Sequence, residues 1–418
     1  MHVRLKDGMT VAKVHESMAA AGWPDMAALD RLVEGIAAGT VETGADGPVP
    51  HDALAALARY GCVVFVDGRA GEATAVVPCR WNFDTRARPA VGDGPYKMAR
   101  LAYVHAEDGA VCLRHPASDC FVRSRDPAAM AVLGRFHGPA EVDAGTAAMA
   151  ALLVRAGVLQ PCDGDGRTMD EARPERRHWE LHDAIFHARS RVGRTEQLVG
   201  ATWRFKGELD QAPAVKANPW TGQVIPLPGA DLMALTQADV PLTAAVEARR
   251  SVRHNSIVPL TALELGAFLY RTVRIRTRYT TPDGEFTSRP YPGGGALYES
   301  EIYVTIDRCV DLPRGFYYYD AERHALCLIA PPDANTEGLL EEARMATAGV
   351  CRPQILLTIA GRHPRFSWKY SGMAYAAQLK NVGVIYQTMY LVATAMNLGG
   401  CALGLGNTDR FLALTGLD

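Results

Sequence analysis

Residues 367–400 read SWKYSGMAYAAQLKNVGVIYQTMYLVATAMNLGG, and they set the expectations for the second half of the chain. From about residue 373 to 398 the stretch is apolar almost all round, which predicts a long buried helix. Lys369 and Tyr370 stand side by side just before it. A surface loop does not need such a pair beside so much apolar sequence. The pair is therefore a candidate for chemistry, and a salt-bridging and packing role is the alternative.

The sequence around this helix contains both helix patterns and strand patterns. A helix, a basic turn and a second helix open the region, and a further helix is expected at 338–349. Strands are expected at 296–307, 315–320, 324–330 and 354–362. This order indicates an α+β domain over residues 236–418 rather than a βαβ repeat.

Two stretches of the first half have similar sequences when they are aligned on Gly61 and Gly157. Each has the pattern of an amphipathic helix closed by a glycine and followed by a strand. A hairpin is expected at Asp108-Gly109, and a helix with Asp126 as N-cap and Pro127 at its first position.

These patterns predict two winged-helix-like modules, at 1–90 and 91–165. The net charge of −2 gives no basic field for nucleic acid, so DNA binding is not expected. Peptide binding along a strand edge is the expected use, and a purely packing role is the alternative.

Residues 166–235 are expected to be a linker that contains a helix. Within it His178 and His182 lie four residues apart, near Glu180, Asp183 and His187. The order differs from the H-E-x-x-H pattern of zinc enzymes, so a packing helix is expected and no metal site is assigned.

Composition places the chain among ordinary globular proteins, with 48% hydrophobic and 22% charged residues in 418. The nine cysteines include no C-x-x-C pair, which favours reduced thiols in a cytoplasmic setting. The first residues lack the apolar core of a secretory signal, and no uncharged apolar run is long enough for a bilayer, so no membrane association is expected.

Common cofactor and nucleotide motifs are missing from the sequence, including the P-loop and a complete G-x-G-x-x-G. Three segments remain as candidates for a binding or catalytic site. RRSVR at 249–253 offers guanidinium groups and a hydroxyl, which suit a phosphate monoester. RPYPGGGALYESE at 289–301 has three glycines, where backbone could approach a flat ligand closely. The third is the Lys369-Tyr370 segment with the glycine-rich turn LGGCALGLG after the helix.

Together these segments resemble the nitroreductase superfamily, and more closely its SagB-type azoline dehydrogenases. The segments WELHDAIFHARSRVGR and ARLAYVHAEDGAVCLRHP resemble upstream parts of multi-domain members. The resemblance implies a nitroreductase-like domain that binds FMN between the subunits of a homodimer.

The resemblance also assigns the cofactor contacts. The expected contacts to the phosphate and ribityl chain are Arg249, Arg250, Ser251 and Arg253. The expected contacts to the flavin ring are Pro292, Gly293, Gly294 and Ala296, with Leu403 and Gly404 bringing a backbone N–H near its N5 atom. Gly293 stands where the family commonly has a serine.

An adjacent Lys-Tyr pair is implicated in catalysis in azoline oxidases of this type, and Lys369-Tyr370 match it. An azoline becomes aromatic by losing a hydride and a proton. FMN would take the hydride, so the protein must take the proton. A lysine serves as that base only if desolvation lowers its ordinary pKa of about 10.4. Tyr370 would orient the ring or relay the proton.

The sequence thus predicts an FMN-dependent enzyme that oxidises thiazoline or oxazoline rings in a ribosomal peptide. Its amino-terminal modules would bind the leader of the precursor peptide. Because nothing in the sequence binds ATP for ring closure, a separate cyclodehydratase partner is expected. The alternatives are an NAD(P)H-dependent flavin reductase or nitroreductase, and a non-catalytic scaffold of the modifying complex.

Overall fold

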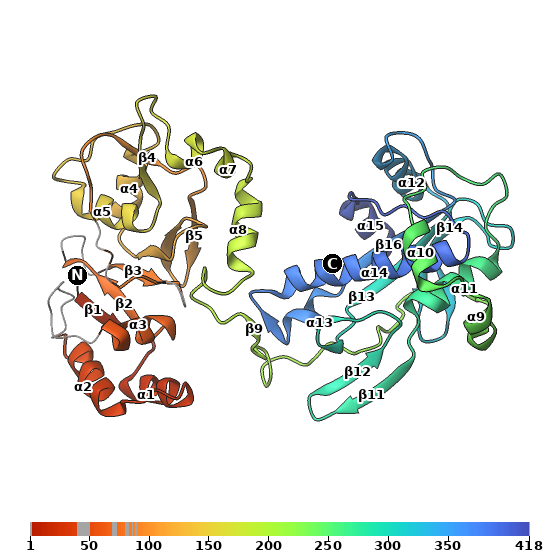
Figure 1. Cartoon of the computed structure of the whole chain (residues 1–418), viewed down its shortest axis with the longest axis horizontal. Coiled ribbons are helices and arrows are strands. Elements are labelled where there is room, and N and C mark those ends of the chain that lie inside the picture. Colours follow the sequence, from red (N-terminus) through yellow and green to blue (C-terminus); the bar gives the residue numbers. More distant parts are fainter. Residues whose placement is uncertain are drawn as a thin grey trace. The chain divides into compact units, whose positions relative to one another are not determined.

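The computed structural model describes residues 2–39, 51–68, 73–79, 83–85, 87 and 90–417. The chain forms two compact units, Met1–Gly200 (unit 1) and Ala201–Asp418 (unit 2) (Figure 1). The strands of unit 1 are β1 (His2–Leu5), β2 (Val63–Val66), β3 (Thr74–Pro78), β4 (Tyr96–Met98), β5 (Tyr103–Glu107), β6 (Ala110–Arg114), β7 (Cys120–Ser124) and β8 (Leu159–Pro161). Its helices are α1 (Val11–Ala20), α2 (Met26–Ala37), α3 (His51–Arg59), α4 (Ala128–Arg135), α5 (Ala147–Arg155), α6 (Met169–Ala172), α7 (Pro174–Arg177) and α8 (Leu181–Arg189).

Six strands of unit 1 form one antiparallel sheet in the order β1-β2-β3-β7-β6-β5. The predicted hairpin at Asp108-Gly109 is confirmed, because Glu107 pairs with Ala110 across a two-residue turn. Asp108 and Gly109 have φ values of 50° and 70°, which this tight turn requires. The predicted glycine ends of two helices are also confirmed, since Gly61 and Gly157 both have φ of 70° after α3 and α5.

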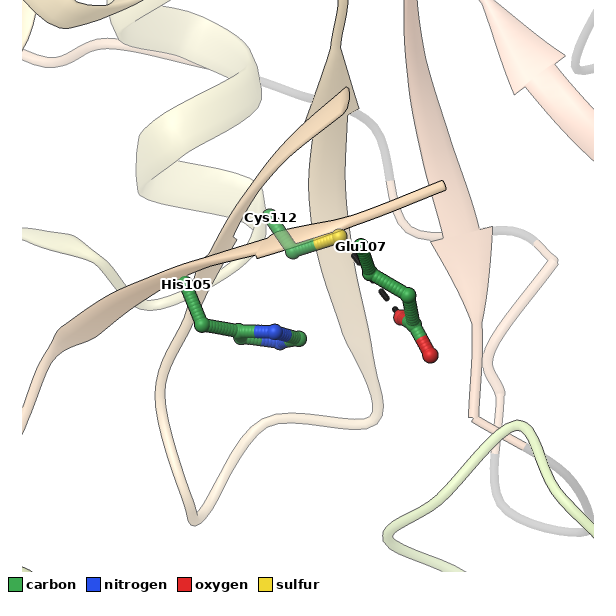
Figure 2. Close-up of side chains that lie close together, drawn as sticks. All are labelled: His105, Glu107 and Cys112. Atoms are coloured by element: carbon green, nitrogen blue, oxygen red, sulfur yellow. Dashed lines mark hydrogen bonds between the residues drawn. The ribbon is translucent and has the colours of Figure 1, made fainter. Parts of the chain in front are cut away.

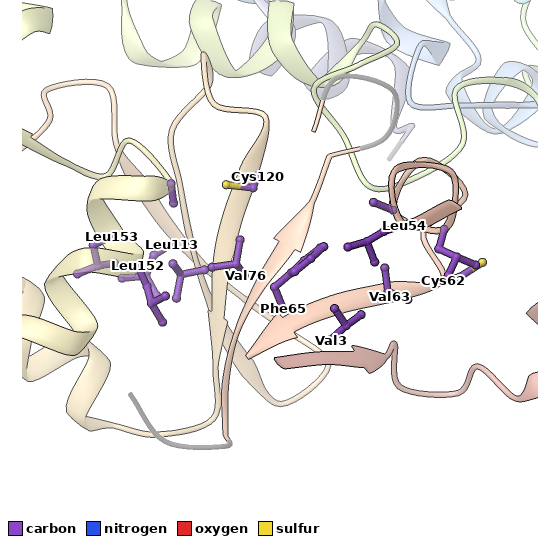
Figure 3. Close-up of a cluster of buried hydrophobic side chains, with 14 of the residues drawn as sticks. Val3, Leu54, Cys62, Val63, Phe65, Val76, Leu113, Cys120, Leu152 and Leu153 are labelled. Carbon is purple, nitrogen blue, oxygen red and sulfur yellow. The ribbon is translucent and has the colours of Figure 1, made fainter. Parts of the chain in front are cut away.

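One hydrophobic core runs through unit 1 (Figure 3). It joins Leu54 of α3 and Phe65 of β2 to Leu113 of β6 and Leu152 of α5. The side chains come from both halves of residues 1–165, so the two halves are packed as one body.

The two winged-helix-like modules are not confirmed. β3 from the first predicted module pairs with β7 from the second, which makes one sheet of the two ranges. The predicted linker is divided as well, because its residues up to 200 belong to unit 1 and those from 201 belong to unit 2. The structure therefore divides the chain at a different place from the predicted boundaries at 90, 165 and 235.

Two buried acidic residues fasten the first part of the predicted linker to the sheet of unit 1. The carboxylate of Asp170 lies 2.9 Å from Nε2 of His115. Glu196 accepts two hydrogen bonds from the guanidinium of Arg114, at 2.8 and 2.9 Å. Both carboxylates are almost fully shielded from solvent, so their partners fix the segment in place.

Strand β9 (Gly200–Ala201) lies at the boundary of the units. The strands of unit 2 are β10 (Val224–Pro226), β11 (Thr277–Thr281), β12 (Gly284–Ser288), β13 (Ser300–Ile306), β14 (Gly315–Asp320), β15 (Ala325–Ala330), β16 (Ile355–Gly361) and β17 (Tyr370–Ser371). Its helices are α9 (Leu232–Ala238), α10 (Leu242–Ala248), α11 (Ala262–Val273), the 3-10 turn η2 (Gly294–Ala296), α12 (Ala334–Ala346), α13 (His363–Ser367), α14 (Ala374–Ala395) and α15 (Thr408–Thr415).

Unit 2 is built on an antiparallel sheet in the order β10-β15-β14-β13-β16. Successive residues of β14 point to opposite faces, so Tyr317 packs with α11 and α14, and Tyr318 packs with α12 and α15. Helices cover both faces, which explains why the strand GFYYYD is apolar or aromatic at nearly every position. The predicted α+β class is confirmed.

The helix predicted at 373–398 exists as α14, but it is not buried all round. Only six of its 22 residues are buried, namely Ala374, Ala377, Gln378, Asn381, Ile385 and Ala393. Two of the large side chains on its open face, Tyr375 and Leu379, are 57% and 47% exposed. An apolar helix half open to solvent is the pattern of a surface that another chain covers.

The stability of unit 1 should depend on pH through Glu196. Burial alone would raise the pKa of Glu196, but hydrogen bonds from Arg114 and the charges of Arg114 and Arg189 lower it from 4.5 to about 2. A carboxyl group with a depressed folded pKa stabilises above its unfolded pKa and loses that contribution as the pH falls. We expect a contribution on the order of 3 kcal/mol, complete above about pH 5 and lost between about pH 4.5 and 2.

The test is chemical denaturation of Glu196→Gln followed by circular dichroism. This change leaves Arg114 with its charge less compensated, so the free energy of unfolding at pH 7 should fall by roughly 3 kcal/mol. Asp165→Asn is the matched control, because the Asp165 side chain is 73% exposed and its pair with Arg167 is a surface one. Equal stability of the two variants at pH 7 would contradict the assignment.

Candidate active site in unit 2

Lys369 and Tyr370 lie between α13 and α14, and both are half-buried. The turn that leaves α13 is closed by a hydrogen bond from the backbone N–H of Lys369 to the carbonyl of Phe366, at 3.3 Å. The Tyr370 ring stacks on the Phe366 ring, with centroids 4.9 Å apart. The stack fixes the direction in which the tyrosine hydroxyl points.

The glycine-rich loop meets this pair at Gly295. A Cβ atom on Gly295 would lie 2.6 Å from the Tyr370 hydroxyl and 3.3 Å from Nζ of Lys369. Gly295 also has φ of 61°, a left-handed conformation that disfavours a side chain. Both functional groups therefore lie directly against the loop, and only glycine fits at this position.

The other two glycines also make room for side chains of the same unit. A Cβ atom on Gly293 would lie 3.0 Å from the Tyr298 ring, and one on Gly294 would lie 3.0 Å from Phe366. The sequence pattern had suggested that the three glycines allow close approach of a flat ligand. In the structure, the close approach is made by aromatic side chains of the protein itself. Of the other predicted loop residues, Pro292 is exposed and Ala296 is half-buried.

Asn381 of α14 anchors the loop. The backbone N–H of Gly294 donates to Oδ1 of Asn381 at 3.2 Å, and Nδ2 of Asn381 donates to the Glu299 carboxylate at 3.0 and 3.2 Å. Burial raises the pKa of Glu299, and the hydrogen bond from Asn381 opposes that effect. Because Glu299 takes the amide N–H groups, the amide oxygen of Asn381 is left facing the loop.

Arg365 fastens α13 to the other end of the loop. Its guanidinium is fully buried and donates to the carbonyls of Leu297, Glu285 and Ala212, at 3.1, 2.7 and 2.6 Å. Burial lowers the pKa of Arg365 to about 10. Three backbone carbonyls thus hold α13, the helix that directly precedes Lys369.

The RRSVR segment follows α10 and lies beside the turn after α14. The hydroxyls of Ser251 and Tyr390 share a hydrogen bond of 2.9 Å, and the N–H of Ala402 donates to the same tyrosine oxygen at 2.7 Å. The N–H of Val252 donates to the carbonyl of Gly400 at 2.9 Å. Tyr390 is therefore the side chain that joins the two segments.

The three arginines of this segment are well placed to bind an anion. Arg250 and Arg253 are exposed, and the half-buried Arg249 lies with its guanidinium carbon 5.3 Å from the centre of the Tyr390 ring. None of the three has an ion-pair partner among the residues that the structure describes. Uncompensated guanidinium groups beside a hydroxyl form a donor set that suits a phosphate group.

Leu403 and Gly404 lie in the same region as the arginines. The Tyr386 hydroxyl donates to the carbonyl of Leu403 at 3.5 Å. A Cβ atom on the exposed Gly404 would meet nothing within 4 Å, so open space adjoins this turn.

The predicted residues thus form two groups. The lysine group contains Lys369, Tyr370, Pro292, Gly293, Gly294 and Ala296, and the arginine group contains Arg249, Arg250, Ser251, Arg253, Leu403 and Gly404. Asn381 binds the first group and Tyr390 the second. These two anchors lie nine positions apart on the helix, which corresponds to roughly 13 Å along the axis.

Trp203 was missed by the analysis of the sequence. The Nζ atom of Lys369 lies 4.6 Å from the centre of the Trp203 ring. Trp203 belongs to the segment TWRFKG, which falls in the predicted linker. The mixture of aromatic and basic residues in this segment could have indicated a packed or functional role, because a solvated linker does not need aromatic side chains.

Two clusters outside this site contain residue types that bind metals. His105, Glu107 and Cys112 lie together on the β5–β6 hairpin (Figure 2). Arg114 already donates to Nε2 of His105 at 2.8 Å and approaches Glu107 at 3.4 Å. A guanidinium bound to two of the three candidate ligands repels a second cation, so we assign no metal site here.

The second cluster contains Glu180, His182 and Asp183, and all three side chains are exposed. It includes one of the histidines singled out in the sequence, although His178 is not a member. An exposed group of this kind is common on helices without a metal ion.

Among the described residues, no helix is long and apolar enough to span a membrane.

Two protein-family models match the chain. Residues 96–196, in unit 1, match the cyanobactin oxidase ThcOx model. Residues 246–418, in unit 2, match the nitroreductase family model. The protein MJ1384 of Methanocaldococcus jannaschii, described as a nitroreductase, is 31% identical over 156 residues, which are 37% of this chain and 74% of that protein.

Solved structures give similar matches. A Ralstonia eutropha protein described as a nitroreductase is 20% identical, with a TM-score of 0.38 over 50% of this chain and 89% of its own. A chain of the Escherichia coli microcin synthetase McbBCD complex with truncated pro-MccB17 is 20% identical, with a TM-score of 0.34 over 53% of this chain and 79% of its own.

The family matches confirm the resemblance found in the sequence. A cyanobactin-oxidase region followed by a nitroreductase domain is the arrangement expected of a SagB-type azoline dehydrogenase. The match to MJ1384 covers most of that protein at an identity above 30%. The chain belongs to the nitroreductase family.

Proposed function

We propose that the protein is an FMN-dependent dehydrogenase that oxidises thiazoline or oxazoline rings of a ribosomally made peptide to thiazoles or oxazoles. The observation that carries the proposal is the approach of Lys369 and Tyr370 to Gly295 inside the nitroreductase-family domain. The cyanobactin-oxidase match in unit 1 supports a peptide substrate.

The arginine group fits the phosphate end of FMN, because its guanidinium groups lack ion-pair partners among the described residues and the Ser251 hydroxyl lies beside them. The loop of Pro292, Gly293, Gly294 and Ala296 and the turn at Leu403 and Gly404 would hold the flavin ring. When bound, FMN supplies a hydride acceptor.

The task left to the protein is to remove a proton from the azoline ring. The neutral amine of Lys369 would form a new N–H bond as the ring C–H bond breaks. The electron pair of that C–H bond becomes the new ring double bond, and hydride leaves from the neighbouring carbon. Tyr370, with its hydroxyl against the loop, would orient the ring or carry the proton onward.

A homodimer would bring the two groups of residues together. Within one chain they contact α14 at Asn381 and Tyr390, roughly 13 Å apart along the helix. The open apolar face of the same helix offers a surface for a second copy. In this arrangement the lysine group of one protomer completes the arginine group of its partner.

Unit 1 would hold the precursor peptide. Its sheet ends in β1 and β5, whose outer backbone groups could pair with an extended leader segment. A cyclodehydratase that forms the azoline rings is the expected partner enzyme, because the sequence has no ATP-binding motif. The protein is expected to work in the cytoplasm.

A second candidate function is an NAD(P)H-dependent flavin reductase or nitroreductase. The similarity to MJ1384 favours it, since that protein is described as a nitroreductase and the alignment covers 74% of it. The reductase would not need Lys369 as a base, so the lysine variants below separate the two candidates.

The first prediction concerns flavin retention. The purified protein should carry FMN, and Arg249→Ala or Arg253→Ala should weaken its binding about 10- to 100-fold, because each lost charge-assisted hydrogen bond costs about 1.5–3 kcal/mol. Titration of the flavin-free protein with FMN measures the change. Arg323→Ala is the control, since that arginine lies 72% exposed on another part of unit 2. Equal FMN affinity in all three variants would remove the segment from the site.

The second prediction concerns the base. Lys369→Ala should keep its flavin spectrum but reduce azoline peptide oxidation about 10²- to 10⁴-fold in a single turnover, because the proton acceptor is gone. Lys369→Arg should not restore the rate, since a guanidinium stays protonated. Tyr370→Phe should reduce the oxidation rate less than Lys369→Ala does if the tyrosine hydroxyl only orients the ring. Oxidation by flavin-loaded Lys369→Ala at the wild-type rate would refute this role.

The third prediction concerns the dimer. Leu379→Glu places a charge on the open face of α14 and should shift the protein toward a monomer in light-scattering measurements of mass. Met345→Glu is the control, because Met345 is 64% exposed on α12, which covers the opposite face of the sheet. A wild-type protein that is monomeric at micromolar concentration while it retains FMN would exclude a shared site.

A further inference from the structure

Lys369 is held by aromatic faces rather than by a carboxylate. Its ammonium nitrogen lies 4.6 Å from the centre of the Trp203 ring and 5.6 Å from that of Tyr370. Among the described residues, Lys369 has no ion-pair partner. Trp203 is the nearer of the two rings, and among aromatic side chains indole attracts a cation most strongly.

The backbone of the Trp203 segment is tied directly to the segment that carries the lysine. The N–H of Trp203 donates to the carbonyl of Lys369 at 3.0 Å. Close by, the hydroxyl of Thr202, one residue before Trp203, shares a hydrogen bond of 2.8 Å with the hydroxyl of Ser371, two residues after Lys369. These two contacts set the position of the indole relative to the lysine side chain.

Trp203 adopts an unfavourable backbone conformation to reach this position. Its φ is 53°, and a bulky residue is seldom found there because the side chain crowds its own backbone. Such strain persists only where surrounding contacts enforce it, and it concentrates at functional sites. An edge-to-face contact with Trp368 at 5.6 Å supports the ring on another side.

Lys206 completes the turn. Its N–H donates to the carbonyl of Trp203 at 2.9 Å, and its ammonium lies 5.2 Å from the indole centre. The same ammonium pairs with Asp283 at 3.2 Å. Residues 202–206 therefore form an anchored strap that presents one indole ring to Lys369.

We propose that Trp203 is a positioning residue, which holds the amine of Lys369 beside Gly295 through a cation–π contact. This inference rests on the proposed role of Lys369 as the base. A carboxylate in place of the indole would bind the ammonium more strongly and oppose loss of its proton. The indole fixes the position of the nitrogen with a smaller energy, so the same nitrogen can lose and accept a proton during turnover.

The test compares Trp203→Phe with Trp203→Leu in the full-length flavin-loaded protein. Phenylalanine keeps an aromatic face, whereas leucine keeps only apolar volume. Single-turnover oxidation of an azoline peptide should fall about 3- to 30-fold in Trp203→Leu and clearly less in Trp203→Phe.

Competitive acylation of lysines, measured by mass spectrometry, gives a readout without turnover. The Lys369 amine should be labelled severalfold faster in Trp203→Leu than in wild type, while the exposed Lys13 of unit 1 serves as internal reference. Labelling of Lys369 in Trp203→Phe should stay near that of wild type. Unchanged labelling in Trp203→Leu, or equal rate losses in both variants, would overturn the positioning role.

The double variant Trp203→Leu with Lys369→Met separates the two hypotheses. If Trp203 acts through the lysine, the leucine change should not slow Lys369→Met further, and an equal additional loss would overturn the proposal. A Lys369→Met protein as fast as wild type would instead refute the proposed base, whereas the labelling result would still report on the contact with Trp203.

Discussion

The close approach of Tyr370 and Lys369 to Gly295 is the contact on which the candidate site depends. A single methyl group at residue 295 would overlap the tyrosine hydroxyl, because its carbon would lie 2.6 Å from that oxygen. The positive φ of the same glycine excludes most other residues independently. The conformation of the loop and the position of the pair therefore depend on each other, although Gly295 and Lys369 lie 74 positions apart in the sequence.

Much of the rest of unit 2 holds this contact in place. Asn381 fixes the loop from α14, and Arg365 fixes α13 through backbone carbonyls. The Trp203 ring lies 4.6 Å from Nζ of Lys369. Further along α14, the Tyr390 hydroxyl is hydrogen-bonded to Ser251 of the arginine group and to the backbone N–H of Ala402. One helix thus carries both halves of the proposed flavin site, which explains why its sequence is apolar yet interrupted by Asn381 and two tyrosines near its end.

The sequence predicted the strands β13 to β16 and the helices α10, α11, α12 and α14, because local patterns determine them, but not the β11–β12 hairpin or α15. For example, β14 is buried on both faces, and its sequence is accordingly almost continuously aromatic. The Lys369-Tyr370 pair was recognisable for a similar reason, since it interrupts an apolar stretch. Long-range pairing was not predictable. Nothing local indicates that β3 pairs with β7 and joins two expected modules in one sheet, or that Glu196 pairs with Arg114 across 82 residues. Trp203 was missed because its role depends on a contact with a residue far along the chain.

Oxidation of azoline rings is the reaction proposed for this protein. Mass spectrometry of an azoline-containing peptide, incubated with the purified flavin-loaded protein in air, tests it most directly. An azoline dehydrogenase should remove two hydrogen atoms per oxidised ring, with no need for NADH or NADPH. A peptide that keeps its mass, while the same preparation oxidises NADH or NADPH rapidly, would contradict azoline oxidation and identify the protein as a reductase.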